Sequence, residues 1–259
     1  MTSSTPTAPA LETRGLTVRF GGHVAVNDVS CRFTPGTLTA IVGPNGAGKT
    51  TYFNLISGQL RATSGLVLVE GEDITSLSPS VRAKRGLGRA FQLTNLFPDL
   101  TALENVRLAV QSRAEAGWSL FRVWNDRRDL IEKAEGILER VRLSDRRHIA
   151  PKALSHGDQR KLEVALLIAM EPKVFMFDEP TAGMSVDEVP TVLDLIQDIK
   201  QRGDATILLV EHKMDVVRSL ADRIVVLHNG ALVADGDPTE VIASPVVQEA
   251  YLGLEAAHD

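Results

Sequence analysis

A short glycine-rich segment has the residue types and the spacing that bind phosphate. Residues 43–50 read Gly-Pro-Asn-Gly-Ala-Gly-Lys-Thr and match the pattern G-x-x-x-x-G-K-[ST] in full. Glycines let successive backbone N–H groups converge on phosphate oxygens, and the N-terminus of a following helix adds positive potential. Lys49 can then reach the β- and γ-phosphates, and the Thr50 hydroxyl can bind Mg²⁺. The candidate nucleotide-binding residues here are Gly43, Pro44, Asn45, Gly46, Ala47, Gly48, Lys49, Thr50 and Thr51.

Two carboxylates occupy the position where a second part of such a site is expected. The apolar run 174–177 is followed directly by Asp178 and Glu179. Ligands of open α/β folds bind at the carboxyl edge of the parallel sheet, which is where these acids would lie. Asp178 would hold the Mg²⁺ shell, and Glu179 would orient and polarise an attacking water. Together the two segments predict nucleotide hydrolysis.

The elements that must position these residues alternate between strand and helix. Strands are predicted from short apolar runs and from alternation of apolar and polar residues, and helices from apolar residues at helical spacing. Asn229-Gly230 predicts a tight hairpin turn between two strands. Residues 101–143 are rich in Arg, Glu and Leu at helical spacing, which predicts a helical insertion between strands. The expected strands are 11–20, 29–33, 38–42, 65–70, 174–177, 206–210, 224–227 and 232–234; the expected helices are 49–57, about 80–85, 159–170, 189–202, 214–220 and one or two after Asp237-Pro238.

Composition and charge exclude several classes of protein. The chain has 259 residues, of which 44% are hydrophobic and 24% charged, as in globular domains. The net charge of −5 has the wrong sign for holding nucleic acid mainly by phosphate neutralisation. Cys31 is the single cysteine, so an intramolecular disulfide is excluded. No run approaches the ~18 apolar residues of a membrane span, so another chain would have to anchor this one to a membrane.

Several further motifs, in chain order, resemble the ATP-binding-cassette (ABC) ATPase family. Leu154-Ser-His-Gly-Asp-Gln-Arg160 stands just ahead of the apolar run that ends in the two acids, and Pro180-Thr-Ala-Gly-Met184 follows it. Gln92 lies where the family has its Q-loop glutamine, His212 where it has its switch histidine, and Phe20 where an aromatic ring stacks on adenine. The resemblance covers the chain from Leu11 to about Gly253.

The resemblance implies the fold class and the domain boundaries. It implies an α/β P-loop NTPase of the ABC type, with a RecA-like core, an antiparallel β subdomain and an inserted α-helical subdomain. The ATPase domain would span 11–237, with the helical subdomain at about 93–158. Residues 1–10 would be a flexible tail without the features of a secretory signal, and 238–259 a helical extension.

The resemblance also implies how ATP and Mg²⁺ are handled. Catalysis would involve Glu179, His212 and Gln92, and the metal ligands would be Thr50, Gln92 and Asp178. Ser155 and Gly157 would act in trans, on the γ-phosphate of a nucleotide held by a second ATPase subunit. A hydroxyl and a glycine N–H at a helix N-terminus suit an anion.

Three residues depart from the family pattern. His156 and Asp158 replace the third and fifth residues of the usual LSGGQ signature, and Ser185 replaces the usual acid of the D-loop. Asp158 puts a negative charge near a phosphate, so the sequence does not determine how tightly the dimer closes on ATP at this site.

Within the family, the chain resembles importers of branched-chain and other hydrophobic amino acids. That resemblance implies a second ATPase subunit (a heterodimer is favoured over a homodimer), two permease subunits and an extracytoplasmic binding protein, with no nucleic acid. The chain would lie peripherally on the cytoplasmic face of the inner membrane. The segments that carry this resemblance are Phe20-Gly-Gly, Leu96–Val106, the Ala182–Ser185 D-loop, the tail Val241–Gly253 and the insert Gly117–Asp129 with Trp118, Phe121 and Trp124.

Other functions fit the sequence less well. An amide or urea importer and a lipopolysaccharide exporter share the same ATPase type, although His156 argues against the exporter's LSGGE-like signature. A mechanical ABC ATPase of DNA repair or translation would carry coiled coils, fused cassettes or basic arms. A small-molecule kinase would leave Leu154–Arg160 and His212 unexplained.

Overall fold

The computed structural model describes residues 8–90, 96–114 and 128–252. The chain divides into two compact units. The first contains the chain up to Leu87, Lys173–Glu179 and the chain from Ile199 onward, and the second contains Gly88–Pro172 and Pro180–Asp198. Each unit is therefore built from segments that are distant in sequence.

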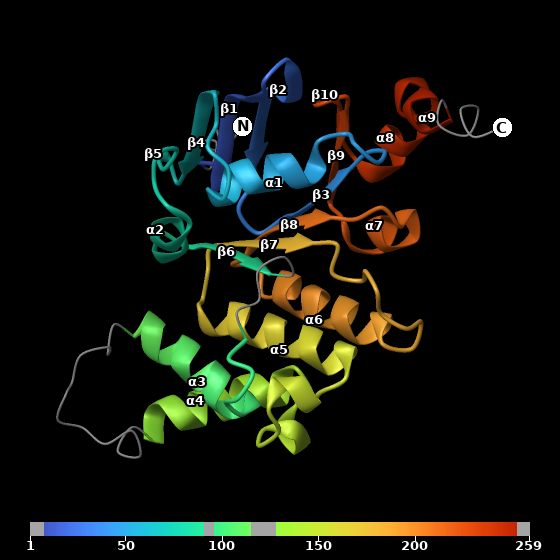
Figure 1. Ribbon diagram of the computed structural model, residues 1–259. Helices are drawn as coiled ribbons and strands as arrows, with labels where there is room; N and C mark the ends of the chain where they lie inside the picture. The colour runs from blue at the N-terminus through green and yellow to red at the C-terminus, as the bar shows by residue number, and fades with distance from the viewer. Residues whose placement is uncertain (1–7, 91–95, 115–127, 253–259) are drawn as a thin grey trace, which may run out of the picture. The chain divides into compact units, whose positions relative to one another are not determined.

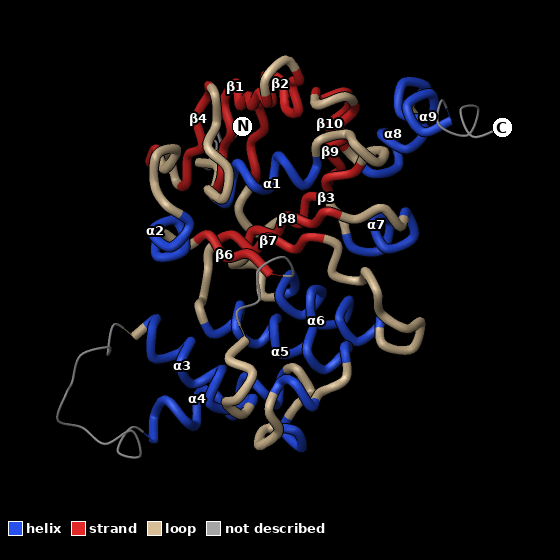
Figure 2. Tube along the Cα trace, viewed as in Figure 1, coloured by secondary structure: helices blue, strands red, loops and turns tan. Residues whose placement is uncertain are grey.

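An antiparallel sheet forms the N-terminal part of the first unit. Its strand order is β2-β1-β4-β5, and β1 pairs with both β2 and β4 (Figures 1 and 2). Buried residues alternate with exposed ones over Val29–Phe33 of β2, whereas Leu11–Thr13 and Leu16–Val18 of β1 are buried in succession, so both faces of β1 are covered there. The strands are β1 (Leu11–Phe20), β2 (His23–Phe33), β4 (Ser64–Val69) and β5 (Glu72–Asp73).

A mainly parallel sheet of order β10-β9-β3-β8-β7-β6 holds the other strands. β3 pairs in parallel with β8 and β9, β7 pairs in parallel with β8, and β10 returns antiparallel along β9. Every residue of β3, β7 and β8 is buried, which explains their continuous apolar sequences. The strands are β3 (Leu38–Val42), β6 (Leu87–Ala90), β7 (Val174–Asp178), β8 (Thr206–Val210), β9 (Arg223–His228) and β10 (Ala231–Gly236).

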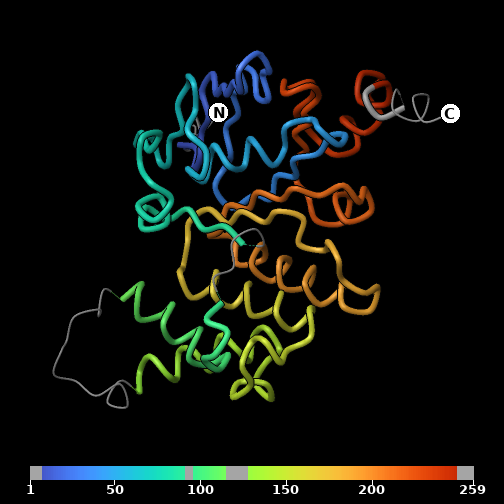
Figure 3. Tube along the Cα trace, viewed as in Figure 1, coloured from blue at the N-terminus to red at the C-terminus, as the bar shows by residue number. Residues whose placement is uncertain are grey.

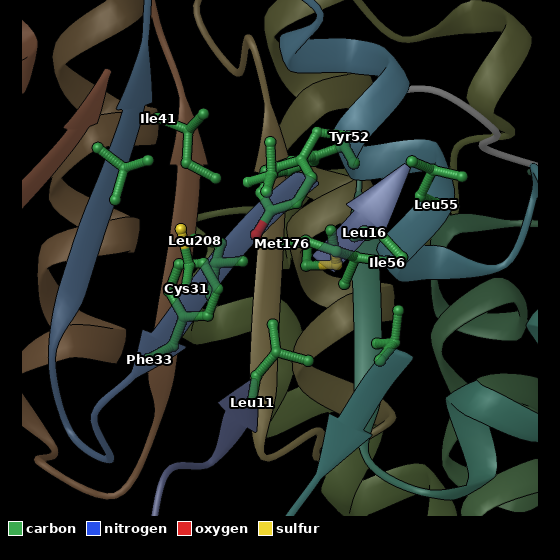
Figure 4. Packing of buried hydrophobic residues seen from close by; sticks show 14 of the residues in the cluster. Leu11, Leu16, Cys31, Phe33, Ile41, Tyr52, Leu55, Ile56, Met176 and Leu208 are labelled. Atoms are coloured by element: carbon green, nitrogen blue, oxygen red, sulfur yellow. The ribbon is translucent and has the colours of Figure 1, made fainter. Parts of the chain in front are cut away.

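Helix α1 (Lys49–Ser57) lies between these two sheets (Figure 1). Its buried side chains pack with residues of β1, β2, β3, β7 and β8 in one apolar cluster (Figure 4). Within that cluster the hydroxyls of Tyr52 and Thr13 lie 2.7 Å apart in a hydrogen bond. The helix ends at Gly58, whose φ of 80° suits glycine. Arg82, from helix α2 (Pro79–Lys84), donates to the carbonyls of Leu55 and Ile56 at that end, so α2 holds the C-terminal end of α1.

Helices form the second unit. α3, α4 and α5 pack against one another, and Figure 3 traces them in chain order from green through yellow-green to yellow. In α4, Leu130, Ala134, Ile137 and Leu138 are buried at helical spacing, which gives the helix one apolar face. The helices are α3 (Ala102–Arg113), α4 (Arg128–Arg140), α5 (His156–Ala169) and α6 (Val189–Gln201), whose last turn belongs to the first unit.

The C-terminal part of the first unit adds three short helices. Val241 and Val247 from two of them pack with Val217, Ile224 and Val226 in a second small apolar cluster. This cluster anchors the end of the chain to β9. The helices are α7 (Met214–Leu220), α8 (Pro238–Ala243) and α9 (Pro245–Leu252).

The predicted fold class is confirmed, and the differences concern element ends and two short strands, β5 and β6. β2 begins at His23 rather than residue 29, because three successive apolar residues, Val24–Val26, and then two polar ones, Asn27 and Asp28, interrupt the alternation that marks its second half. β6 was not predicted, since Leu-Gly-Arg-Ala carries a glycine and a charge. α5 begins at His156, three residues before the predicted start, because Ser155 caps it. The insert residues Trp118, Phe121 and Trp124 lie outside the described residues.

Candidate functional site

Three chain segments with candidate site residues leave the parallel sheet at one edge. β3, β8 and β7 are adjacent parallel strands, so their carboxyl ends lie together. In register, Val210 at the end of β8 pairs with Ile41 on one side and Asp178 on the other. The phosphate loop follows β3, the two acids end and follow β7, and Glu211-His212 follows β8. This is the edge at which open α/β folds bind ligands.

The loop from Gly43 to Gly48 has a backbone that only glycine fits at two positions. Gly43 has φ 148°, and a Cβ there would lie 2.1 Å from the Leu227 carbonyl oxygen. Gly48 has φ 97°, and a Cβ there would lie 2.5 Å from the Ala25 carbonyl oxygen. The Gly230 N–H donates to the Ala47 carbonyl, so the β9–β10 hairpin supports the loop. Helix α1 starts directly after Gly48 without a side-chain cap, so its N-terminal N–H groups suit an anion.

Lys49 lies buried at the start of α1, with 7% of its surface exposed. Its Nζ donates to the carbonyls of Gly43 at 2.7 Å and Pro44 at 2.9 Å. Burial lowers the pKa of the ammonium group, and the nearby carboxylates of Glu179 and Asp178 act in the opposite direction. The loop therefore holds a positive charge at its centre, facing two acids.

The acids at the end of β7 differ in setting. Asp178 is buried, with 4% of its surface exposed, whereas Glu179 is half-buried. Glu179 has a φ of 49°, which is uncommon outside glycine, and its N–H donates to the Val210 carbonyl at 2.9 Å. Such backbone geometry is often found at functional sites. The backbone therefore leaves its extended β7 conformation at Glu179, directly after Asp178.

Phe20 and His212 are the exposed members of the candidate set. Phe20 ends β1 beside the Gly21-Gly22 turn, with 51% of its surface exposed, so its ring is open to stacking. His212 follows β8 with 53% of its side chain exposed. Thr50 and Thr51 are half-buried in the first turn of α1. Gln92 lies outside the described residues.

The signature residues lie in the second unit, at the N-terminus of α5. The Ser155 hydroxyl caps this helix by accepting from the Asp158 N–H at 3.1 Å. The Gln159 amide donates to the carbonyls of Pro151 and Leu154, which fixes the turn that precedes the cap. His156 is exposed. Ser155 thus presents a hydroxyl at the positive end of a 14-residue helix.

The negative charge of Asp158 is paired within its own helix. Lys161 Nζ lies 2.8 Å from Asp158 Oδ1, and about a fifth of each side chain is exposed, 17% for Lys161 and 19% for Asp158. A partly buried pair keeps more of its mutual attraction than a fully solvated pair. Asp158 departs from the LSGGQ pattern, but its negative charge is balanced by the positive charge of Lys161.

Glu188 connects two of the segments that the sequence singles out. One carboxylate oxygen, Oε2, accepts from the Ser185 hydroxyl at 3.1 Å and lies 3.4 Å from the Ser185 N–H. The other, Oε1, would lie 2.2 Å from a Cβ built on Gly157, so the Glu188 side chain packs against the Gly157 backbone. The serine that replaces the usual D-loop acid is thus the hydrogen-bond partner of an acid three residues later.

We expect Gly157→Ala to destabilise the isolated chain by about 1 kcal/mol, because the new methyl group must displace Glu188. Gly136→Ala is the matched control: it is also helical, a Cβ there meets nothing within 4 Å, and it should stabilise by about 0.5–1 kcal/mol. Urea unfolding of both variants measures the difference. The Gly157→Ala/Glu188→Ala double variant should recover part of the loss, and a purely additive result would refute the steric explanation.

Sequence reasoning missed Glu188 and Glu211. The Ser185–Glu188 spacing is that of S-x-x-E, a pattern that often marks a side chain bonded to a turn. Glu211 follows a fully buried strand, much as Asp178 and Glu179 end and follow β7, and its side chain is completely buried. Both signals were present in the sequence, but a lone acid beside a motif is common in proteins of any function.

Comparison with known proteins agrees with this geometry. The family model described as "ABC transporter" matches residues 26–182. The model described as "Branched-chain amino acid ATP-binding cassette transporter" matches residues 231–257. The structure titled as the ADP conformation of MJ1267, an ATP-binding cassette of an ABC transporter, superposes with a TM-score of 0.81 at 30% identity, covering 95% of this chain and 100% of that one.

Two curated relatives match over nearly their whole length. The chain is 38% identical over 250 residues to the high-affinity branched-chain amino acid transport ATP-binding protein BraF of Pseudomonas aeruginosa. It is 36% identical over 250 residues to the protein of the same description, LivG, of Escherichia coli. Each alignment covers 95% of this chain and 98% of the relative.

The phosphate loop, the paired acids and the parallel sheet that positions them define a P-loop ATP-binding protein. With the family match and these relatives, the chain belongs to the ABC transporter family, as one of its ATP-binding proteins.

Proposed function

We propose that this chain hydrolyses ATP to energise an importer of branched-chain or other hydrophobic amino acids. The observation that carries the proposal is the agreement between two independent regions. The ATP-binding cassette matches residues 26–182, and the C-terminal segment that contains β10, α8 and α9 matches the branched-chain amino acid model. Both relatives above are described as branched-chain amino acid transport proteins.

The residues of the phosphate loop fit a magnesium nucleotide. The loop N–H groups and Lys49 would bind the phosphates, and Phe20 would stack on the adenine ring. The Thr50 hydroxyl and the buried Asp178 carboxylate are oxygen ligands of the kind Mg²⁺ prefers, and Gln92 would complete the set. When bound, Mg²⁺ neutralises charge that develops on the phosphate oxygens.

Glu179 would orient the attacking water, and His212 would contact the γ-phosphate. Glu179 leaves β7 in a left-handed backbone turn beside the adjacent strand end, next to the positive charge of Lys49. Hydrolysis needs a positioned water and charge stabilisation rather than a covalent intermediate. A half-buried carboxylate that can accept a hydrogen bond from water meets the first need.

A second ATPase subunit would complete the site. Ser155 and Gly157 would close on the partner's γ-phosphate, with the α5 N-terminus favouring the anion. A heterodimer is the favoured arrangement, bound to two permease subunits that receive solute from an extracytoplasmic binding protein. No helix in the described part of the chain is long and apolar enough to cross a membrane. By analogy with the ATP-binding proteins of amino acid importers, the chain would lie on the cytoplasmic face of the inner membrane through its contacts with the permeases.

The loop at Phe97 fits a docking point for a permease. Phe97 is 53% exposed, although large apolar side chains are usually buried. The buried Asn105 accepts from the Phe97 N–H and donates to the carbonyls of Phe97, Leu100 and Thr101. One amide side chain thus binds the backbone at both ends of the segment 97–101, next to the exposed ring.

We expect Phe97→Asp to uncouple ATP hydrolysis from transport. The exposed ring contributes little to folding, so basal ATPase activity of the isolated chain should stay within about twofold of wild type. Burying a carboxylate at an apolar contact is costly, so solute uptake should fall about tenfold or more. Val246→Asp changes a side chain of similar exposure, 54%, on α9 and serves as the control. Normal uptake with Phe97→Asp would remove this loop from the docking surface.

Purification of the tagged chain from its native membranes tests the assembly. We expect two permease proteins and a second, different ATP-binding protein to copurify. Recovery of a soluble nucleic-acid-processing complex instead would contradict it.

A further inference from the structure

Glu211 is a buried acid to which the proposed ATPase reaction assigns no role. Its exposed fraction is 0%, lower than that of Asp178, Glu12 or Glu163, the other buried acids of the described chain. It follows the last residue of β8 and precedes His212. Burying a carboxylate has a large free-energy cost unless hydrogen bonds compensate for the lost water. The buried Glu211 carboxylate therefore needs hydrogen-bond donors close to it within the protein.

Its carboxylate binds the backbone of the turn that carries His212. Oε2 accepts from the N–H of His212 at 3.0 Å and from the N–H of Lys213 at 3.3 Å. These bonds shape the connection between β8 and α7, which starts at Met214. The same oxygen lies 3.8 Å from Nδ1 of the His212 ring. One buried atom thus faces both the backbone and one nitrogen of the imidazole.

This geometry distinguishes the two ring nitrogens. In a neutral imidazole one nitrogen carries the proton and the other accepts hydrogen bonds, and the neighbours of the ring decide which. A carboxylate beside Nδ1 favours the proton on Nδ1. Because 53% of the His212 side chain is exposed, Nε2 is then the nitrogen available to a ligand in solvent.

We propose that Glu211 is a positioning residue that holds the His212 ring with its proton on Nδ1 and presents Nε2 to the γ-phosphate side of the site. The inference rests on the proposed function in assigning His212 to the phosphate. The tautomer itself does not depend on that assignment. At 3.8 Å the carboxylate oxygen is beyond hydrogen-bond distance of Nδ1, so it acts on the ring through its charge.

Glu211→Gln separates this role from simple turn formation. Glutamine has almost the same shape, and its side-chain oxygen can still accept from the two backbone N–H groups. The negative charge facing Nδ1 is lost. Asp215→Asn is the matched control, because it removes a carboxylate of the exposed first turn of α7, three residues from His212.

Nitrogen-15 NMR of the full chain with labelled histidine tests the inference directly. Spectra are recorded at a pH at which the imidazolium signals have disappeared, so that the ring is neutral. His212→Asn identifies its signals among the six histidines. The expected wild-type form is predominantly Nδ1–H, shifting toward Nε2–H in Glu211→Gln and unchanged in Asp215→Asn. A predominantly Nε2–H ring in the wild type overturns the proposal, even if Glu211→Gln does not fold. An unchanged ring in a folded Glu211→Gln overturns it as well.

ATPase assays of the chain with its copurified partners give an independent readout. Glu211→Gln should lower kcat about tenfold with little change in KM for ATP, because the ring's orientation matters for the transition state more than for binding. A raised KM with unchanged kcat would point to a merely structural role and contradict the proposal. If His212→Ala leaves hydrolysis unchanged, the assignment of His212 to catalysis fails, whatever tautomer the NMR shows.

Discussion

Replacing Glu179 by glutamine is expected to remove most ATP turnover while ATP binding is retained. Glutamine keeps the size of the side chain and can form hydrogen bonds, but it cannot act as a carboxylate toward the attacking water. General-base assistance contributes about 10²- to 10⁴-fold to such reactions, so kcat should fall by at least about 100-fold. The left-handed backbone at residue 179 is compatible with either side chain, so the fold should be preserved.

Lys49→Ala provides the contrasting variant. Its ammonium lies at the centre of the phosphate loop, so its loss should weaken nucleotide binding itself.

Asp178→Asn should mainly weaken the dependence on Mg²⁺. Binding of a fluorescent ATP analogue and phosphate release by the assembled complex separate the three effects. Wild-type turnover in Glu179→Gln would refute the role given to Glu179.

Ser155→Arg is expected to impair the nucleotide site of the partner subunit and to leave this chain's own nucleotide binding intact. The hydroxyl caps α5 and is exposed, so an arginine fits sterically in the isolated chain at the cost of a cap, about 1 kcal/mol. In the closed dimer the larger side chain would occupy the space that the partner's γ-phosphate needs.

The experiment mixes this variant with a wild-type partner and follows each nucleotide separately. Photocrosslinking with an azido-ATP analogue reports which subunit holds nucleotide, and ATPase activity of the complex should fall at least about tenfold. Ser155→Ala controls for loss of the cap alone. A structure or crosslink that places Ser155 against phosphates bound to its own chain would contradict the trans arrangement.

The sequence predicted the parts of the site where local chemistry dictates local structure. Gly43 and Gly48 adopt backbone angles that exclude other residues, so their spacing carries structural information. β3, β7 and β8 are buried on both faces, so their apolar sequences could be recognised without knowing what covers them. The order β3-β8-β7, which brings the phosphate loop beside Asp178, was not predicted and is seen in the structure.

Interactions between distant residues could not be predicted in this way. The contact of Glu188 with Gly157 joins positions 31 residues apart, and no local pattern encodes that packing. The pairing of Asp158 with Lys161 was within reach, since the two are three residues apart on a helix, but the signature motif drew attention to the acid alone. The roles given to the site residues stay predictions, and for Gln92 and most of the insert at 117–129 the positions are not described either, because residues 91–95 and 115–127 lie outside the described chain.

Uptake of radiolabelled leucine tests the central claim most directly. A strain that lacks this chain is complemented with the wild type, with Glu179→Gln, or with an empty vector. We expect deletion to abolish high-affinity leucine uptake and the wild type to restore it. We expect Glu179→Gln to be produced at the same level without restoring uptake. Unchanged leucine uptake after deletion, with no other importer compensating, would contradict the assignment of a branched-chain amino acid importer.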